Sequence, residues 1–480
     1  MNIRRLFSDA GISALRVIVL SIRSLLIISI ITKLIGSGAQ GIWATILALV
    51  GLFASAGGLH MHGALIRYSP SSDASQVFSD TLTVTLMMSI LTGAIFYILS
   101  GAILSVINPS GDISTTLMIP AAVYTGASLL SSFLSNYPRA LRRVKRYEAL
   151  LIALNGIEVI VLAVTLYLSE SLLDGFWALA LTHIIFDFVF LFVFSRDDLT
   201  IPDISTFPLY LRYAVPMVPK ELSGTLLSHA DKILIIRFLG PSAAGIYTVS
   251  YTISSFLQKL AGIFNSTLYP NVTAAWENEE FDELSRFYSN FLRGYVLFAL
   301  PAIGGLSFLS VAILRFISTP EIAVNGEWIV PILAVGFAFQ GAEGFLSYPL
   351  QAAEETTRLS IITFFAVILN LCLNLVLLPI IGLEGAAVAT TVSFGFRTVL
   401  LFHLSKSIID FNFPILMTGK AIAATTIMVI VLIMMPINSQ PLLLVVAPVT
   451  GVLIYFVSLW LVRGLTRDDI AVAQSYITNQ

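Results

Sequence analysis

Leu34-Ile-Gly-Ser-Gly-Ala-Gln-Gly-Ile-Trp43 recurs 204 residues later in the chain as Phe238-Leu-Gly-Pro-Ser-Ala-Ala-Gly-Ile-Tyr247. Gly36, Ala39, Gly41 and Ile42 match Gly240, Ala243, Gly245 and Ile246 at that offset. Glycine lets the chain turn between adjacent helices within a few residues, because its φ can take either sign. Two such turns at the same place in each half of the chain indicate an internal duplication, a common construction of transporters.

Shorter repeats extend the pattern. Tyr137-Pro138 returns as Tyr348-Pro349, and the glycine motif returns a third time as Ile381-Gly-Leu-Glu-Gly-Ala-Ala387. Six predicted helices separate the two main copies, so both halves enter a membrane from the same side and form a parallel repeat. We predict two six-helix lobes, 1–200 and 205–405, facing each other across a cleft, followed by two additional helices and a short cytoplasmic tail in 410–480.

Composition places the chain in a membrane. Of 480 residues, 57% are apolar and 11% are charged, against about 25% charged in an average soluble domain. The apolar runs do not alternate as barrel strands would, so they predict helices of membrane-spanning length. The fold class predicted is an all-α polytopic membrane protein with about fourteen transmembrane helices, or twelve if one hairpin is misassigned. The spans are 12–35, 40–62, 81–107, 115–137, 147–169, 173–195, 212–239, 243–269, 288–316, 328–350, 359–381, 384–405, 415–436 and 441–462.

Basic loop residues set the orientation. With the N-terminus inside, the outer links hold only Lys33, Arg237 and Arg315, whereas the inner loops hold many more, including the run from Arg139 to Arg146. The positive-inside rule therefore predicts a multi-pass protein of the cell membrane with both termini cytoplasmic. The first apolar run has no small-residue cleavage site and is expected to be a retained helix. Cys372 is the only cysteine, which excludes an internal disulfide, and a net charge of −2 does not favour nucleic acid.

Ionisable residues within the spans are costly and usually face a cavity. Residues 7 or 11 apart share a helix face, so Arg16 and Arg23 form one basic stripe. Lys220 and Asp231, and likewise Glu221 and Lys232, fall on one polar face, with Gly224 and Ser228 between them and His229 pointing away. We predict that a substrate-binding cavity is lined by Arg16, Arg23, Lys220, Asp231, Lys232, Lys259, Arg293 and Arg397.

Structural roles remain open for several of these residues. Asp231 and Lys232 could instead pair with neighbours and hold their helix in the bundle. Arg16 lies near a helix end and could extend its charge to the membrane surface, as could Lys259 and Arg293. Pro216 and Pro219 would bend the seventh helix, either as a gate or as a fixed kink.

Three stretches resemble a known family. Asp231-Lys-Ile-Leu-Ile-Ile-Arg-Phe-Leu-Gly-Pro-Ser-Ala-Ala-Gly-Ile-Tyr247 is similar to the seventh-helix signature of polysaccharide flippases. Leu369-Asn-Leu-Cys-Leu-Asn-Leu-Val-Leu-Leu-Pro379 and the following Gly382 to Thr390 resemble their eleventh and twelfth helices. The superfamily is that of multidrug, oligosaccharidyl-lipid and polysaccharide exporters. The resemblance implies fourteen helices in two pseudo-symmetric lobes around a central cavity, working by alternating access.

Two functions follow from the resemblance. The first is flipping of a polyprenyl-(pyro)phosphate-linked oligosaccharide from the cytoplasmic to the outer leaflet, which the excess of basic residues favours because Arg and Lys bind phosphate. The alternative is an ion-coupled antiporter of the MATE type, whose members use a carboxylate on helix one. The first helix here has two arginines and no acid. Glu158, Asp187, Asp231 and Glu343 are the candidates for coupling to H⁺ or Na⁺, and the residues do not decide among them.

No enzyme is predicted. The chain has no Walker or dinucleotide motif, and its first outer link is short and without acid, unlike that of a membrane glycosyltransferase. His60 and His62 are two residues apart and would diverge on a continuous helix, so we expect no metal site and no cofactor. We expect a monomer whose partners are membrane lipids and the lipid-linked substrate.

Overall fold

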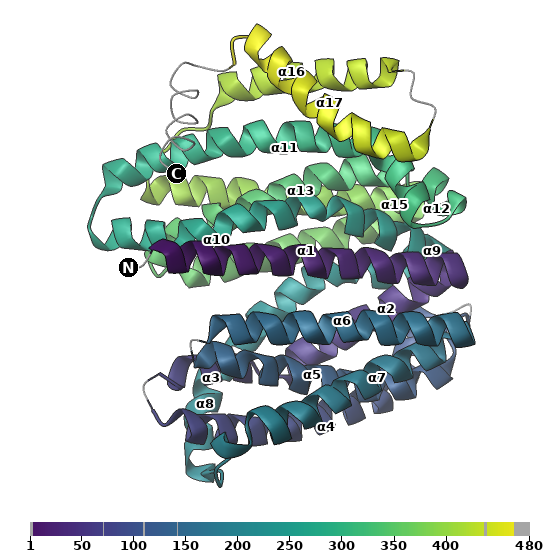
Figure 1. Cartoon of the computed structure of the whole chain (residues 1–480), viewed down its shortest axis with the longest axis vertical. Helices are drawn as coiled ribbons and strands as arrows, with labels where there is room; N and C mark the ends of the chain where they lie inside the picture. The colour runs from purple at the N-terminus through teal and green to yellow at the C-terminus, as the bar shows by residue number, and fades with distance from the viewer. Residues whose placement is uncertain (1–2, 71, 109–110, 142, 436–438, 465–480) are drawn as a thin grey trace. The chain divides into compact units, whose positions relative to one another are not determined.

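The computed structural model describes residues 3–70, 72–108, 111–141, 143–435 and 439–464. For residues 3–18, 144, 194, 263–267, 269–271 and 274 it gives the helical backbone without the side chain. All elements in the described ranges are helical, which confirms the all-α prediction (Figure 1). The longer helices are α1 (Ile3–Leu34), α2 (Ser37–Gly57), α3 (Met61–Tyr68), α4 (Ala74–Ile107), α5 (Met118–Ala140), α6 (Val144–Ser169), α7 (Leu172–Val189), α8 (Phe207–Ala214), α9 (Val218–Ser254), α10 (Phe256–Glu277), α11 (Phe281–Ile317), α13 (Ile329–Leu346), α15 (Thr356–Ile408), α16 (Ile415–Met434) and α17 (Gln440–Leu461).

Short helical pieces join these helices. They are η1 (Thr115–Leu117), η2 (Phe190–Phe194), η3 (Arg196–Asp198), η4 (Ile204–Thr206), η5 (Val215–Met217), α12 (Pro320–Asn325) and α14 (Tyr348–Ala352). Most are single 3₁₀ turns, and η2 is one turn of π-helix that continues α7. The links between spans are therefore too short to hold a further folded domain.

The number of membrane crossings agrees with the prediction. Within the described residues, eleven helical stretches are long and apolar enough to cross a membrane. Two of them, Ile204–Gly262 and Thr356–Ile408, leave helical geometry at Gly240 and at Ile381 and Gly382. These breaks turn eleven stretches into thirteen, and α1, a helix of 32 residues outside those eleven, would be the fourteenth.

The chain divides into two compact units. The first comprises Met1–Thr252 with Ile317–Thr319 and Thr363–Ala389, and the second comprises Ile253–Phe316, Pro320–Ile362 and Thr390–Gln480. In the first unit α1 packs on α6, and α5 packs on both α4 and α7; in the second, α10 packs on α13 and α16 on α17 (Figure 1). The repeat predicts lobes with other bounds, 1–200 and 205–405, and those bounds remain a proposal.

The outward faces of the helices are apolar. On α4, Ile90 and Ile98 are 76% and 73% exposed, and on α6 Leu168 is 77% exposed. A helix in water would carry polar residues at such positions, and continuous apolar surface of this extent requires lipid or a partner. The core of the first unit is also apolar, with Phe78 stacked on Tyr137 at 4.0 Å between ring centroids.

The two copies of the glycine motif meet inside the first unit. Gly36 and Gly240 hold φ of 119° and 85° and make the turns, whereas Gly41 and Gly245 lie where α2 crosses the second part of α9. A Cβ on Gly41 would overlap the carbonyl oxygen of Pro241, and a Cβ on Gly245 would overlap that of Ser37. Ser37 and Pro241 are equivalent positions of the repeat, so the contact is reciprocal, as at a two-fold axis.

Two predicted spans are interrupted. The second helix, expected over 40–62, ends at Gly57, and Leu59 and His60 take positive φ of 46° and 56° before α3 begins. The seventh, expected over 212–239, is divided by the 3₁₀ turn Val215–Met217, which contains Pro216. Proline has no amide hydrogen to give to a continuing helix, so the interruption follows from the sequence.

A buried carboxylate fastens the segment before α8 to α4. Asp80 is fully buried. Its Oδ1 accepts hydrogen bonds from the Gln76 amide group and the backbone N–H of Asp203, both at 2.8 Å. Its Oδ2 accepts from the Thr206 hydroxyl at 2.8 Å and the Tyr210 hydroxyl at 3.3 Å. One side chain therefore fastens the end of the connection between α7 and α8 to α4.

Replacing Asp80 with Ala is expected to lower the free energy of unfolding by roughly 3 kcal/mol, because one buried and three partly buried hydrogen bonds lose their charged acceptor. The measurement is the thermal unfolding midpoint of the purified protein in detergent. Asp73→Ala is the matched control, since Asp73 is exposed and caps the same helix by accepting from the Ser75 amide at 3.0 Å. Its expected cost is about 1 kcal/mol, and equal effects of the two substitutions would contradict the anchoring role.

Candidate functional site

A cavity of about 470 Å³ lies along one face of α9 in the first unit. Glu221, Gly224 and Ser228 line it, as three members of the predicted polar face. His229 lines it too, so the prediction that His229 points away is wrong. Thr225 and His229 are one helical turn apart and lie beside the predicted face. The polar face of α9 is therefore wider than the one predicted from residue spacing.

Asp231 and Lys232 are buried in the next turn of α9, at 2% and 8% exposure. Asp231 accepts hydrogen bonds from the Tyr247 hydroxyl at 2.6 Å and from the backbone N–H of Lys232 at 2.8 Å. The Lys232 ammonium lies 3.2 Å from His229 Nδ1 and 4.7 Å from the centre of the Tyr251 ring. The imidazole of His229 and the ring face of Tyr251 therefore hold the Lys232 ammonium inside the first unit.

A second buried polar group joins α1, α5, α6 and α7. Arg23 Nη2 is 2.6 Å from Glu158 Oε2. The other oxygen of Glu158 is 2.6 Å from Nε2 of His183. His183 Nδ1 is 2.8 Å from the Ser131 hydroxyl, which donates to Asp187 Oδ1 at 2.5 Å. These five side chains form one continuous polar chain across apolar helices.

The hydrogen bonds of this chain need one hydrogen more than a neutral His183 and the Ser131 hydroxyl supply. Its three contacts between Glu158 and Asp187 each need a hydrogen. A neutral His183 supplies one and the Ser131 hydroxyl supplies another. With both carboxylates ionised, no hydrogen is left for one of the three contacts, and the lone pairs of its two atoms would face each other and repel. The chain therefore carries one further proton, on the imidazole or on a carboxylate, and moving that proton reverses the direction of the hydrogen bonds.

Asp187 also borders a larger hollow. A cavity of about 790 Å³ lies between α4, α5 and α7, and its lining is apolar except for Ser89, Tyr97 and Asp187. Gly93 and Gly126 face one another across α4 and α5, where a Cβ on either would press on the opposite backbone. The proton-carrying chain thus ends at a space that is open enough for water or an acyl chain.

The second unit contains a further buried ion pair. Arg397 Nη1 of α15 is 2.7 Å from Glu343 Oε2 of α13, and Glu343 is buried. Thr391 and Thr398 of α15 donate to the backbone carbonyls of Ile332 and Phe339 at 2.8 and 3.0 Å. Buried polar groups therefore hold α13 and α15 together along their length.

The remaining predicted residues lie in different surroundings. Lys220 is exposed in the first turn of α9. Lys259 Nζ lies 5.1 Å from the Phe256 ring centre, and Arg293 Nη2 lies 3.5 Å from the carbonyl oxygen of Gly464. The side chain of Arg16 lies outside the described residues.

Sequence reasoning missed His183, Ser131 and Asp80. His183 stands four residues before Asp187, one turn away on the same helix face, and this spacing was the available signal. Ser131 gives no such signal, because a serine in an apolar helix usually bonds its own backbone. Asp80 directly precedes the predicted span 81–107, so the sequence places it in a loop.

Solved structures identify the fold. The lipid II flippase MurJ in an inward closed conformation matches 94% of this chain and 97% of its own length, with a TM-score of 0.76 at 17% identity. An inward-facing multidrug transporter of the MATE family in the MOP superfamily matches 80% of this chain and 93% of its own, with a TM-score of 0.65 at 15% identity. The chain therefore has the same helical fold as these two solved structures.

Sequence comparison identifies the family. The family model described as polysaccharide biosynthesis protein matches residues 30–321, and the chain belongs to this family. A probable low-salt glycan biosynthesis flippase of Haloferax volcanii, Agl15, is 27% identical over 216 residues, which is 45% of this chain and about half (46%) of that relative. A probable flippase of the same organism, AglR, is 26% identical over 425 residues and 85% of each chain.

Proposed function

We propose that the protein flips a polyprenyl-(pyro)phosphate-linked oligosaccharide from the cytoplasmic to the outer leaflet by alternating access, for the assembly of surface glycans. The observation that carries the proposal is the set of ionisable side chains buried inside apolar helices, because such side chains are costly there and usually mark a transport pathway. The polysaccharide biosynthesis family and the similarity to the probable glycan biosynthesis flippase Agl15 support the same substrate class, and the probable flippase AglR matches along 85% of this chain. The predicted orientation, with both termini cytoplasmic, is part of the proposal.

Ion pairing changes how the positive charge would be used. Arg23 and Arg397 are paired with Glu158 and Glu343, so two of the cations on which the sequence argument rested are balanced by acids. We propose that the pyrophosphate exchanges places with a carboxylate at Arg23. Glu158 would keep its hydrogen bond to His183 during the exchange, so it is not left without a partner when the arginine turns to the phosphate.

The proton of the Glu158–His183–Ser131–Asp187 chain is the coupling ion in this proposal. Among the four carboxylates predicted for coupling, Glu158 and Glu343 contact arginines, and Asp231 lies next to Lys232. Asp187 has the Ser131 hydroxyl as its partner and borders a cavity. It is therefore the carboxylate that we propose to exchange H⁺ with the cavity.

A MATE-type antiporter is the second candidate, favoured by these same buried carboxylates and by the MATE structural match. Its cargo would be a cation, and binding would need a carboxylate whose partner leaves. Both functions predict buried acids, so a transport assay must separate them.

Purified protein in lipid vesicles is expected to move a labelled polyprenyl-pyrophosphate oligosaccharide across the bilayer, measured by a lectin that binds only glycan outside. Lys220→Ala and Lys232→Ala are expected to slow this transfer about tenfold or more, if each lysine contributes one phosphate contact of 1.5–3 kcal/mol. Lys420→Ala is the matched control, because Lys420 donates to the carbonyl oxygen of Arg463 at 2.7 Å in the second unit. If the vesicles instead export a cationic dye in response to an ion gradient and transfer no glycan, the protein is an antiporter and not a flippase.

A further inference from the structure

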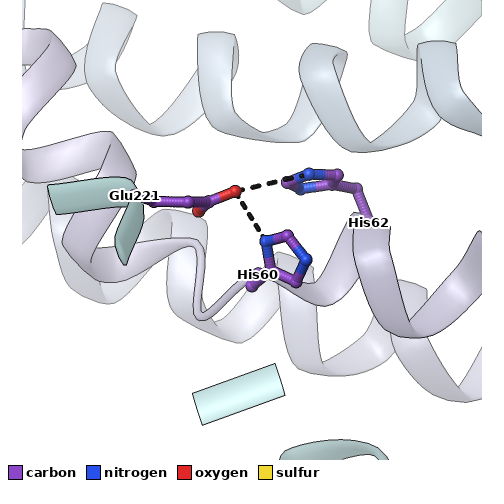
Figure 2. Close-up of side chains that lie close together, drawn as sticks. All are labelled: His60, His62 and Glu221. Atoms are coloured by element: carbon purple, nitrogen blue, oxygen red, sulfur yellow. Dashed lines mark hydrogen bonds and ion pairs between the residues drawn. The ribbon is translucent and has the colours of Figure 1, made fainter. Parts of the chain in front are cut away.

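Three side chains that belong to neither arginine–glutamate pair converge on one point (Figure 2). His60 Nδ1 lies 2.6 Å from Glu221 Oε1, and His62 Nε2 lies 3.5 Å from the same oxygen. The two imidazole rings are 4.5 Å apart between centroids. All three ligand atoms lie within 4.8 Å of one another.

The break after α2 creates this arrangement. On a continuous helix His60 and His62 would point about 200° apart, which is why the sequence predicted no metal site. That prediction rested on a helix which the structure does not have: Leu59 and His60 take left-handed φ, and only His62 belongs to α3. Non-glycine residues in this conformation cost of order 1–3 kcal/mol and tend to persist at functional sites.

Gly63 completes the arrangement. A Cβ at this position would overlap the imidazole of His60, so glycine is what lets the ring lie against the start of α3. Glu221 comes from the first turn of α9, more than 150 residues away. The three side chains are partly exposed, at 19%, 35% and 29%, and they line the 470 Å³ cavity. Ions can therefore reach them from the cavity.

We propose that His60, His62 and Glu221 bind a divalent transition-metal ion such as Zn²⁺. Two imidazole nitrogens and one carboxylate oxygen form a frequent zinc ligand set that leaves a fourth position for water or another oxygen ligand. A hydrogen bond accounts for the contact of His60 with Glu221, but at 3.5 Å it does not account for the second imidazole that faces the same oxygen. An ion between the three would lie about 2.0–2.2 Å from each ligand after small side-chain rotations.

The site would also join two parts of the first unit. His60 and His62 belong to the turn and helix after α2, whereas Glu221 belongs to the start of α9, directly after the interruption at Val215–Met217. A bound ion would fasten these segments and stabilise the arrangement seen here, because a ligand that binds one conformation raises its population. The fourth position faces the cavity, where an anionic oxygen could complete the coordination.

Zinc content of the full-length protein tests the proposal. The protein carries a tag without histidine and the Cys372→Ser change, because that cysteine is exposed and could bind zinc by itself. After chelation, addition of Zn²⁺ and desalting, elemental analysis is expected to find one Zn²⁺ per chain. Since loss of an outer-shell partner alone costs about 10- to 100-fold in metal affinity, His60→Ala, His62→Ala and Glu221→Gln should each weaken binding by about 100-fold or more.

Two further variants make the result specific. His403→Ala removes an exposed histidine of the second unit and is expected to bind zinc like the parent. Gly63→Ala keeps every ligand but displaces the His60 ring, and should weaken binding. Zn²⁺ should also raise the unfolding midpoint of the parent and not of the ligand variants, as linkage requires. A parent that retains no zinc, or ligand variants that retain as much as the parent, would overturn the proposal.

Discussion

Oxidation of a Ser37→Cys/Ser242→Cys double variant is expected to stop transfer of the lipid-linked glycan, and reduction is expected to restore it. The two hydroxyl oxygens are 2.6 Å apart, and a disulfide needs about 2.05 Å between sulfurs. A covalent bond would therefore form in the conformation described here. The background must carry Cys372→Ser, so that these are the only two thiols.

The expected size of this effect comes from where the bond lies. Ser37 and Ser242 begin the two segments that cross at Gly41 and Gly245, where backbone touches backbone. In the predicted orientation, this contact between the two copies of the repeat lies at the outer end of the helices. Alternating access requires the copies to separate there when the substrate leaves outward, so a bond across the contact traps one state.

Controls decide whether the bond itself is responsible. Each single-cysteine variant, and the double variant with both thiols alkylated before oxidation, should be resistant to the oxidant. Formation of the cross-link is followed by the change in mobility after a protease cut between the two positions. If the fully cross-linked protein transfers glycan at the parent rate, this contact does not open and alternating access does not operate through it.

Local patterns in the sequence were enough to predict the helices. Apolar runs, the glycine turns at Gly36 and Gly240 and the basic loops depend on neighbours a few residues away, so the fourteen spans and the interruption near Pro216 could be read directly. The polar face of α9 was predicted for the same reason, because Glu221, Gly224 and Ser228 follow helical periodicity. The prediction was wrong for His229, which lines the cavity beside the predicted polar face.

Partners on different helices could not be predicted from one sequence. Nothing local indicates that Arg23 faces Glu158, 135 residues later, or that Arg397 faces Glu343. The excess of basic residues within the predicted spans indicated a positively charged interior. In the structure, Arg23 and Arg397 are instead paired with acidic residues. The role of Gly41 and Gly245 is a similar case: their motif indicates a turn, but it is the crossing of two distant helices that excludes a side chain.

Replacing Glu158 with Gln is expected to destabilise the protein by about 3–5 kcal/mol, the usual cost of leaving one member of a buried ion pair without its partner. Arg23 would lose its counter-charge at 2.6 Å, and the amide could still accept from His183 Nε2 through its oxygen. The measurement is the unfolding midpoint in detergent, together with glycan transfer in vesicles. Both should fall.

Adding Arg23→Met separates stability from function. The double variant has no buried charge at this position, and replacement of a whole ion pair by uncharged groups is often neutral in stability. We therefore expect its unfolding midpoint to return close to that of the parent. Glycan transfer should not return, because the side chain proposed to hold the pyrophosphate is missing.

The same pair of substitutions at Glu343→Gln and Arg397→Met gives a matched comparison in the second unit. If the Arg23→Met/Glu158→Gln protein is both stable and fully active, Arg23 serves packing alone and the partner exchange is wrong. Persistent instability of the double variant would instead show that the arginine contributes through its apolar contacts. Arg23→Lys in the otherwise native protein then keeps the charge and discriminates further, since lysine can hold phosphate only as a point charge.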